Sequence, residues 1–486
     1  MPKSKIIKNY LYTLVGQVLN IIIPIITTPY ISRVLGATNI GIYSYTLSIS
    51  TYFIVVGSLG FPLYGQREIA FVAHDKKKLS NVFFKIMYAQ LALLTITLLL
   101  YFPVVIYLLK DNLEIQLLQS IGIIGGVFAT SWLYYGIEEF KVTVAKNIFV
   151  KLFATASVFI FVKAEADLPL YTAIIGLSNV IGNLIILVDA KKYVDFKQFR
   201  VKLSDIFLSI KPALILGIPY YITSIYAVID RTMLGSMGSG YSEVGYYEQS
   251  QKIVLLLMSV ITSIGTVMLP RLANDLGQNK KDEAKRLLNR GTDLVLLLSF
   301  PVCMGLIVVG DMIVPWFFGP GYEKVGILIQ LFAPLMVING LSNLLGNQYL
   351  VAQKKEKVLS ITILFSIIIN LGLNWLLIPR FDAIGATIAT LVAEFIKVII
   401  QFYMVNDVNF EPFIKCLGKY LGLSLAMSLF VYMIRKMYFT QANFLNCVLL
   451  AGIGMVIYLI ELLVVRDKNT EMFLTAIRDK ISKKLN

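Results

Sequence analysis

Long apolar segments recur along the whole chain and set the strongest limit on how it can fold. Of its 486 residues, 57% are hydrophobic and only 15% are charged, whereas ordinary soluble domains carry roughly 25% charged residues. Too few charged residues are present to cover the surface of a large soluble protein. In lipid the backbone must be hydrogen-bonded within each crossing segment, which favours helices. The sequence therefore predicts an all-α polytopic membrane protein.

Hydropathy predicts about 14 transmembrane helices, since each apolar segment is near the ~20 residues needed to cross the hydrocarbon layer. Their predicted limits are 8–32, 40–63, 82–108, 114–137, 142–163, 168–189, 209–234, 244–270, 292–318, 325–352, 358–379, 383–406, 413–434 and 444–465. The first segment continues past Pro24 with no small-residue cleavage site after it, so we interpret it as a retained span rather than a signal peptide.

Basic residues gather in alternate loops. With the N-terminus placed inside, the inner segments hold 31 of the 44 lysines and arginines, the outer segments hold eight, and the other five lie within spans. This asymmetry predicts that both termini are cytoplasmic and that the number of spans is even. The net charge of +15 is thus explained by membrane topology, and no nucleic-acid partner is expected.

Residues that hold metals or perform catalysis are scarce. The three cysteines lie in or beside apolar segments without metal-ligand spacing, and the single histidine, His74, lies in a polar loop. We therefore expect no metal, no cofactor and no catalytic residue. A membrane-embedded glycosyltransferase or polymerase usually carries a large soluble loop or clustered carboxylates, and the chain has neither. A passive scaffold for a polysaccharide assembly complex stays open as an alternative.

Two stretches of the chain resemble each other, Ile23–Ile49 and Gly217–Ile253. The matched positions are Pro24 with Pro219, Gly36 with Gly235, Gly41 with Gly245, and Ile49 with Ile253. With six spans in each half, the two halves would have the same orientation and be related by an axis along the membrane normal. A substrate site is then expected between two pseudo-symmetric six-helix lobes.

The repeat and the loop charges predict five regions. Residues 1–190 form an N-lobe of six spans, 191–208 a cytoplasmic linker, and 209–407 a C-lobe of six spans. Residues 408–466 add two extra helices, and 467–486 form a cytoplasmic tail. In that tail Phe473, Ile477, Ile481 and Leu485 recur at every fourth position, which is typical of an amphipathic helix on the membrane surface.

Six motifs, spread over about the first 400 residues, resemble one transporter family. They are TTPYISRVLGATNIGIYSY (27–45), GFPLYGQREIA (60–70), WLYYGIEEFKVTVAKNIFVKL (132–152), DRTMLG with VGYYEQSQKI (230–253), MLPRLA (268–273) and NWLLIPRFDAIGATIATLVAE (374–394). This ordered set resembles the Wzx-type flippases, the polysaccharide-transporter branch of the multidrug/oligosaccharidyl-lipid/polysaccharide exporter superfamily.

The resemblance implies a function and partners. It implies two lobes around a central cavity, plus two further helices, that move polyprenyl-(pyro)phosphate-linked oligosaccharide repeat units across the cytoplasmic membrane by alternating access. The product would serve capsular or other surface polysaccharide synthesis. Membrane lipids, a polysaccharide polymerase and assembly proteins are the expected partners, and a proton or sodium gradient is the expected energy source.

The chemistry of such a substrate points to particular cations. A lipid-linked phosphate needs a hydrated, basic cavity, and no acidic residue occurs in the middle of the first six predicted spans. Arg33 and Lys151 are the candidates in the first half, and Arg231 and Lys252 in the second. The alternatives are interfacial snorkelling for Arg33 and Lys151, and an ion pair with an acid on another span for Arg231.

The second repeat copy also carries acids. Glu248 and Lys252 are four residues apart, so they can pair on one helix face. Glu248 and Asp230 are candidates for binding a coupling cation or proton, because charges within spans are costly and usually functional. The alternative for Glu248 is a fixed structural pair with Lys252. Glu394 and Lys397 form a similar pair, for which we favour the structural interpretation.

Tyrosines, prolines and glycines complete the predicted site. Tyr43 and Tyr247 are candidate sugar contacts, although tyrosine is also common at membrane interfaces. Proline removes a helix hydrogen bond and glycine permits bends. The hinge candidates are therefore Pro24, Pro219, Gly36 and Gly235.

A cation-coupled multidrug or metabolite antiporter of the same fold is the runner-up function. Such a protein binds organic cations, so acids would be expected inside the first lobe, and the predicted spans of that lobe lack them.

Overall fold

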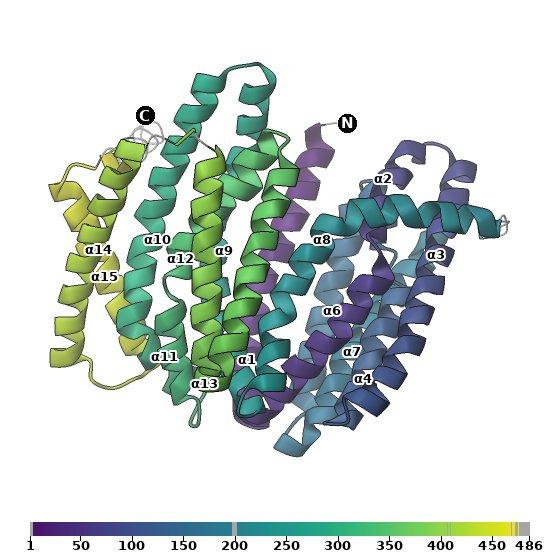
Figure 1. Ribbon diagram of the computed structural model, residues 1–486, viewed down its shortest axis with the longest axis horizontal. Helices are drawn as coiled ribbons and strands as arrows, with labels where there is room; N and C mark the ends of the chain where they lie inside the picture. The colour runs from purple at the N-terminus through teal and green to yellow at the C-terminus, as the bar shows by residue number, and fades with distance from the viewer. Residues whose placement is uncertain are drawn as a thin grey trace. The chain divides into compact units, whose positions relative to one another are not determined.

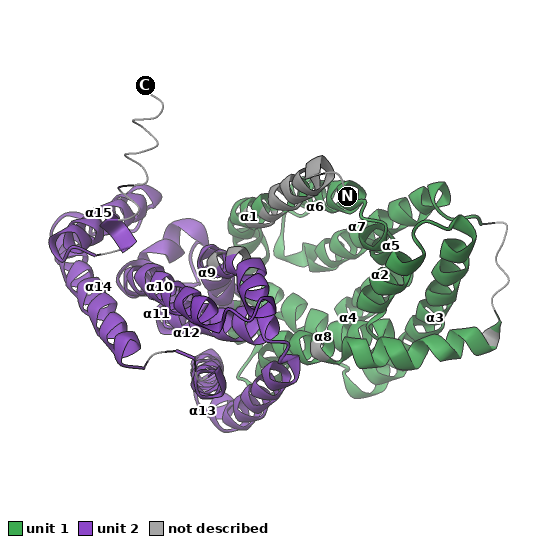
Figure 2. Ribbon diagram, turned by 90° about the horizontal axis from the view of Figure 1, so that it is seen from above, with its two compact units in different colours: residues 1–245 green, residues 246–486 purple. Residues whose placement is uncertain are grey.

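The computed structural model describes residues 3–196, 202–405, 407–408, 410–467, 469–471 and 475. All regular structure in these residues is helical, which confirms the all-α prediction. The chain forms two compact units, residues 1–245 and residues 246–486 (Figure 2). Ten helices of the described residues are long and apolar enough to cross a membrane, or twelve if each of two bent helix pairs counts as one span.

The helices follow one another in chain order (Figure 1). Unit 1 contains α1 (Lys3–Ser58), α2 (Phe61–Val72), α3 (Lys76–Pro103), η1 (Val104–Leu108), α4 (Leu113–Val127), α5 (Ser131–Gly136), α6 (Phe140–Phe161), η2 (Glu165–Asp167), α7 (Leu168–Asp189), η3 (Ala190–Lys192) and α8 (Leu203–Met237). Helix α9 (Tyr241–Gly277) begins in unit 1 and continues into unit 2. Unit 2 contains α10 (Lys281–Phe317), α11 (Glu323–Phe332), α12 (Leu335–Ser342), η4 (Asn343–Leu350), α13 (Glu356–Val405), α14 (Phe410–Tyr438) and α15 (Phe444–Val464).

Helix α8 is sharply bent. Its segments Ser204–Ile218 and Tyr220–Met237 meet at 59°, and the residue at the bend, 219, is a proline, which cannot donate a helix hydrogen bond. The first segment passes α2 and α3, and the second runs along α1 (Figure 1). The division into two compact units falls at residue 245, after α8. The assignment of the two six-helix lobes stays a prediction.

The predicted span 114–137 is interrupted between α4 and α5. The Gln90 side chain, which is buried, donates to the carbonyls of Gly126 (2.7 Å) and Ala129 (3.1 Å) and accepts from the Trp132 indole (3.2 Å). Asn183 donates to the carbonyl of Gly125 at 2.9 Å. The carbonyls of Gly125 and Gly126 also accept from the backbone N–H groups of Phe128 and Ala129. Gln90 of α3 and Asn183 of α7 therefore add bonds that tie neighbouring helices to the interrupted segment.

In unit 2, helices α10, α14 and α15 pack against one another. Asp467, just after α15, is buried and accepts hydrogen bonds from Tyr420 (3.0 Å), from Lys419 and from the backbone N–H of Thr470 (3.0 Å). Burial acts to raise the pKa of Asp467, but the bonds from Lys419, Thr470 and Tyr420 outweigh it and hold the pKa below its ordinary value. This carboxylate fixes the chain where it leaves α15.

The amphipathic tail helix predicted from Phe473, Ile477, Ile481 and Leu485 lies outside the described residues. It stays a prediction.

Candidate functional site

The two copies of the sequence repeat meet at a close helix crossing within unit 1. A methyl group on Gly41 of α1 would overlap the carbonyl oxygen of Tyr241, at the start of α9. A methyl group on Gly245 would overlap the carbonyl oxygen of Ala37. Each glycine thus lies against the carbonyl four residues before the other, so equivalent positions of the two copies pack reciprocally. Only glycine allows the two backbones to approach this closely.

Gly36 and Gly235, which the sequence matches, lie in different backbone settings. Gly36 has φ 73° and ψ 168°, a backbone region that is essentially restricted to glycine, and it separates the two halves of α1. Gly235 lies inside α8, where a methyl group would overlap the ring of Tyr45, so close packing accounts for this glycine. Its hinge role stays a prediction.

Hydroxyl groups connect α1 to α8 beyond the crossing. The Thr232 hydroxyl is hydrogen-bonded to Ser48 (2.8 Å) and Tyr52 (2.9 Å), and it donates to the carbonyl of Val228 (3.1 Å). Such bonds contribute only about 0.6 kcal/mol each in membrane proteins. Their main effect is to set the register of α1 on α8.

The predicted cations and acids of unit 1 lie on three helices. Arg33 is exposed, one turn before the break at Gly36, and Lys151 is half-buried near the middle of α6. On α8, Arg231 is half-buried and Asp230 is buried. All four lie in helices that the sequence predicts as spans or at their ends; their roles in binding phosphate (Arg33, Lys151 and Arg231) or a coupling ion (Asp230) stay predictions.

Tyr43 is half-buried, and its ring meets that of Tyr171 edge-on, with 4.9 Å between ring centres. Tyr247 belongs to unit 2 and is fully buried. The hydroxyl of Tyr247 is hydrogen-bonded to Thr390 (3.2 Å) and its ring packs against Phe332. In this structure the Tyr247 ring is therefore covered by protein, whereas Tyr43 keeps part of its surface open.

The predicted i, i+4 pair forms in α9. The Lys252 ammonium lies 3.4 Å from a Glu248 carboxylate oxygen, and the two side chains are 40% and 10% exposed. The exposed lysine and the covered glutamate make Lys252 the partner that can reach a ligand. The Glu394–Lys397 pair is shorter, 2.5 Å, with Glu394 buried and Lys397 half-buried. Its structural interpretation stays a prediction.

A buried polar row on α13 was not anticipated from the sequence. Thr362, Ser366, Asn370 and Asn374 are all fully buried, and the two asparagine side chains are hydrogen-bonded at 3.1 Å. Their spacing of four residues places them on one helix face, and that spacing was the available signal. Buried polar groups within spans are costly and often functional.

Comparison with known proteins identifies relatives over most of the chain. Residues 6–274 match the family described as polysaccharide biosynthesis protein, and residues 232–453 match the family described as lipid II flippase MurJ. An Escherichia coli (strain K12) protein named "Putative O-antigen transporter" is 24% identical over 394 residues, covering 81% of this chain and 94% of that protein. A Shigella dysenteriae protein of the same name is 26% identical over 409 residues, covering 83% and 100%.

The fold is that of a solved transporter. The structure of lipid II flippase MurJ in an inward closed conformation matches with a TM-score of 0.77 and 16% identity, covering 94% of this chain and 99% of that one. At this identity the match establishes the shared fold and not the substrate.

The glycine crossing predicts a stability effect. Gly41→Ala and Gly245→Ala should each lower the melting temperature of the purified protein, because overpacking a close contact costs about 1–3 kcal/mol. Gly372→Ala is the matched control, since Gly372 lies within a helix and a methyl group there meets no neighbouring atom within 4 Å. Equal melting temperatures for all three variants and the native protein would contradict the close crossing.

Proposed function

The chain belongs to the polysaccharide biosynthesis protein family, which its match over residues 6–274 establishes, and we propose that it is a flippase for polyprenyl-(pyro)phosphate-linked oligosaccharides. The protein is a multi-pass membrane transport protein and not an enzyme. In this proposal it carries repeat units across the cytoplasmic membrane by alternating access, for capsular or another surface polysaccharide. Relatives named as O-antigen transporters support a lipid-linked glycan as the substrate class.

The charge distribution of α1 to α7 is the observation that carries the proposal. Arg33 and Lys151 lie in the membrane-spanning helices α1 and α6, whereas acids lie at helix ends and turns: Glu138 and Glu139 between α5 and α6, Glu165 and Asp167 in η2, and Asp189 at the end of α7. Spans that carry cations and lack acids attract a phosphate and disfavour organic cations. This distribution therefore supports the flippase over a multidrug or metabolite antiporter of the same fold.

Two long helices support a higher span count than ten to twelve. Residues 22–72 and 356–405 each form one candidate segment, of 51 and 50 residues. Fifty helical residues extend about 75 Å, more than twice the ~30 Å hydrocarbon thickness. Each segment contains a non-helical residue, Gly36 or Asp382, where the chain can reverse. We infer two spans in each, hence about 14 in all, with both termini cytoplasmic.

Alternating access needs places where helices can bend. The break at Gly36 and the 59° bend at residue 219 supply two such places in unit 1. Pro24 lies inside a continuous part of α1, where it removes one hydrogen bond. We propose that Gly36 and Pro219 are the hinges and that Pro24 adds compliance to the part of α1 before Gly36.

Transport by reconstituted protein tests the proposed substrate and its cations. Native protein in proteoliposomes should translocate a fluorescent polyprenyl-pyrophosphate oligosaccharide. Arg33→Gln, Arg231→Gln and Lys252→Gln should each slow this about ten- to one-hundred-fold, since a hydrogen bond between charged groups contributes about 1.5–3 kcal/mol.

Lys110→Gln is the matched control, because Lys110 is exposed in the loop before α4 and should leave the rate unchanged. Native rates in all three arginine and lysine variants would refute the phosphate site. Uptake of organic cations without glycolipid transport would favour the antiporter.

Energy coupling through Glu248 can be tested separately. If its carboxylate exchanges Lys252 for a proton or cation, Glu248→Gln should remove the acceleration of transport by an imposed proton or sodium gradient. Glu411→Gln is the control, because Glu411 is an exposed acid paired with Lys415 at 2.6 Å. An unchanged gradient dependence in Glu248→Gln would leave Glu248 as a fixed structural partner of Lys252.

The orientation can be checked by cysteine labelling. In a background without Cys303, Cys416 and Cys447, Lys110→Cys should react with an impermeant maleimide in intact cells. Gln278→Cys, in the exposed turn between α9 and α10, should react only after permeabilisation, because the proposed topology places that turn in the cytoplasm. The opposite labelling pattern would invert the topology.

A further inference from the structure

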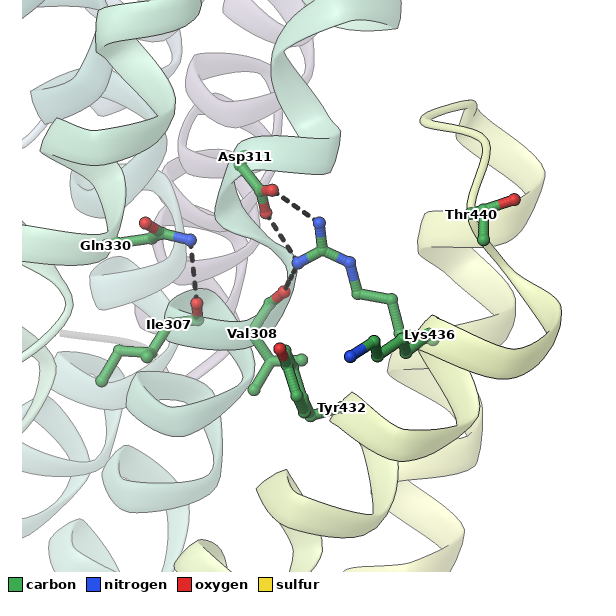
Figure 3. A pocket seen from close by; sticks show the side chains of 8 residues that line it. Ile307, Val308, Asp311, Gln330, Tyr432, Lys436 and Thr440 are labelled. Atoms are coloured by element: carbon green, nitrogen blue, oxygen red, sulfur yellow. Dashed lines mark hydrogen bonds and ion pairs between the residues drawn. The ribbon is translucent and has the colours of Figure 1, made fainter.

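A pocket of unit 2 lies beside the C-terminal part of α10, shortly before the chain turns into α11. It has a volume of about 590 Å³ and lies between α10, α11 and α14 (Figure 3). Its lining residues are Ile307, Val308, Asp311, Gln330, Tyr432, Arg435, Lys436 and Thr440. Ile307 and Tyr432 are 39% and 52% exposed, so the pocket opens along the apolar surface of the protein. The proposed transport function uses none of these residues.

An ion pair organises the wall of this pocket. Arg435 of α14 makes two bonds to the Asp311 carboxylate of α10, of 2.9 Å and 2.5 Å, and also donates to the carbonyl of Val308 (Figure 3). A guanidinium has five N–H donors, and these bonds use three of them. Two N–H donors of Arg435 are left for a ligand, and the ion pair holds the guanidinium in place.

Lys436 makes the pocket positive. Among the described residues its ammonium has no ion-pair or hydrogen-bond partner, and its side chain extends from α14 toward α10 (Figure 3). Asp311 and Arg435 cancel, so Lys436 leaves one net positive charge. A neighbouring pocket of about 470 Å³ shares Asp311, and its other charged lining residue is Glu323, which makes that pocket acidic. The two pockets therefore differ in the sign of their charge.

The positive charge lies at the depth of lipid phosphates. Arg435 and Lys436 are in the last turn of α14, directly after an apolar stretch in which Leu429 and Met433 are 62% and 60% exposed. Exposed apolar side chains on a membrane helix face acyl chains, and the headgroups begin where the apolar stretch ends. The pocket thus presents apolar walls toward the hydrocarbon and cations toward the headgroups.

We propose that this pocket is a binding site for an anionic glycerophospholipid, whose phosphate is held by Lys436 and by the two remaining N–H donors of Arg435. The hydroxyl of Tyr432 and the amide of Gln330 are placed to contact the glycerol, and an acyl chain lies along Ile307. A volume of about 590 Å³ is in the range of pockets that hold small-molecule ligands. It suits a phosphoglycerol headgroup rather than an oligosaccharide, so a membrane phospholipid is the occupant and the transported glycolipid is not.

Native mass spectrometry of the full-length protein tests the site. Delipidated protein in a non-ionic detergent is titrated with phosphatidylglycerol and, separately, with zwitterionic phosphatidylcholine. Phosphatidylglycerol should bind more tightly. Lys436→Gln should weaken its binding about five-fold, the contribution expected of one lysine at an anionic lipid surface. Asp311→Asn should strengthen it, because removal of the carboxylate frees more of Arg435 and raises the net charge of the pocket.

Lys324→Gln is the matched control. Lys324 follows Glu323 at the start of α11, at the same end of unit 2 but outside the lining of either pocket. This variant removes the same charge and should bind phosphatidylglycerol like the native protein.

Three results would overturn the proposal. One is equal affinity for the two phospholipids. Another is an equal loss in Lys324→Gln and Lys436→Gln, which would indicate diffuse surface attraction. The third is displacement of phosphatidylglycerol by an equimolar amount of undecaprenyl phosphate, which would identify a polyprenyl lipid as the occupant. None of them bears on glycolipid transport, which the proteoliposome assay measures separately.

Discussion

The need to satisfy every backbone hydrogen bond inside the membrane governs this structure. Where helices continue, the helix itself meets that need; where they break, tight turns and side chains must replace the missing bonds. At the break between α4 and α5, the N–H groups of Phe128 and Ala129 reach the carbonyls of Gly125 and Gly126, and the side chains of Gln90 and Asn183 add further bonds to these carbonyls.

The two repeat copies approach each other closely, and the membrane environment gives the reason. Between membrane helices little hydrophobic driving force remains, so packing and interhelical hydrogen bonds must hold them together. The reciprocal contacts of Gly41 and Gly245 supply the packing, and Thr232 with Ser48 and Tyr52 supplies the bonds. The glycines let the two backbones approach closely, and the hydroxyl bonds contribute only about 0.6 kcal/mol each.

Charged residues differ between the two parts of the chain. Arg33 and Lys151 lie in spans of α1 and α6, whereas acids inside spans occur in α8 and α9. In α9, Glu248 is covered and its partner Lys252 is more exposed. At the far end of α10, the ion pair of Asp311 and Arg435 serves a different purpose, because it orders a wall beside an uncompensated Lys436.

The sequence by itself determined the all-α membrane class and the pairing of Glu248 with Lys252, because hydropathy and helical spacing are local properties of the chain. Spacing along the chain cannot show which glycine meets which backbone. Only tertiary structure decided that Gly245 faces α1 and that α8 packs within unit 1. The pocket beside Lys436 was likewise invisible, because it joins α10 and α11 to α14, which comes much later in the chain. Which helix faces meet depends on packing between segments that are far apart in the chain. A single sequence, examined segment by segment, does not contain that information.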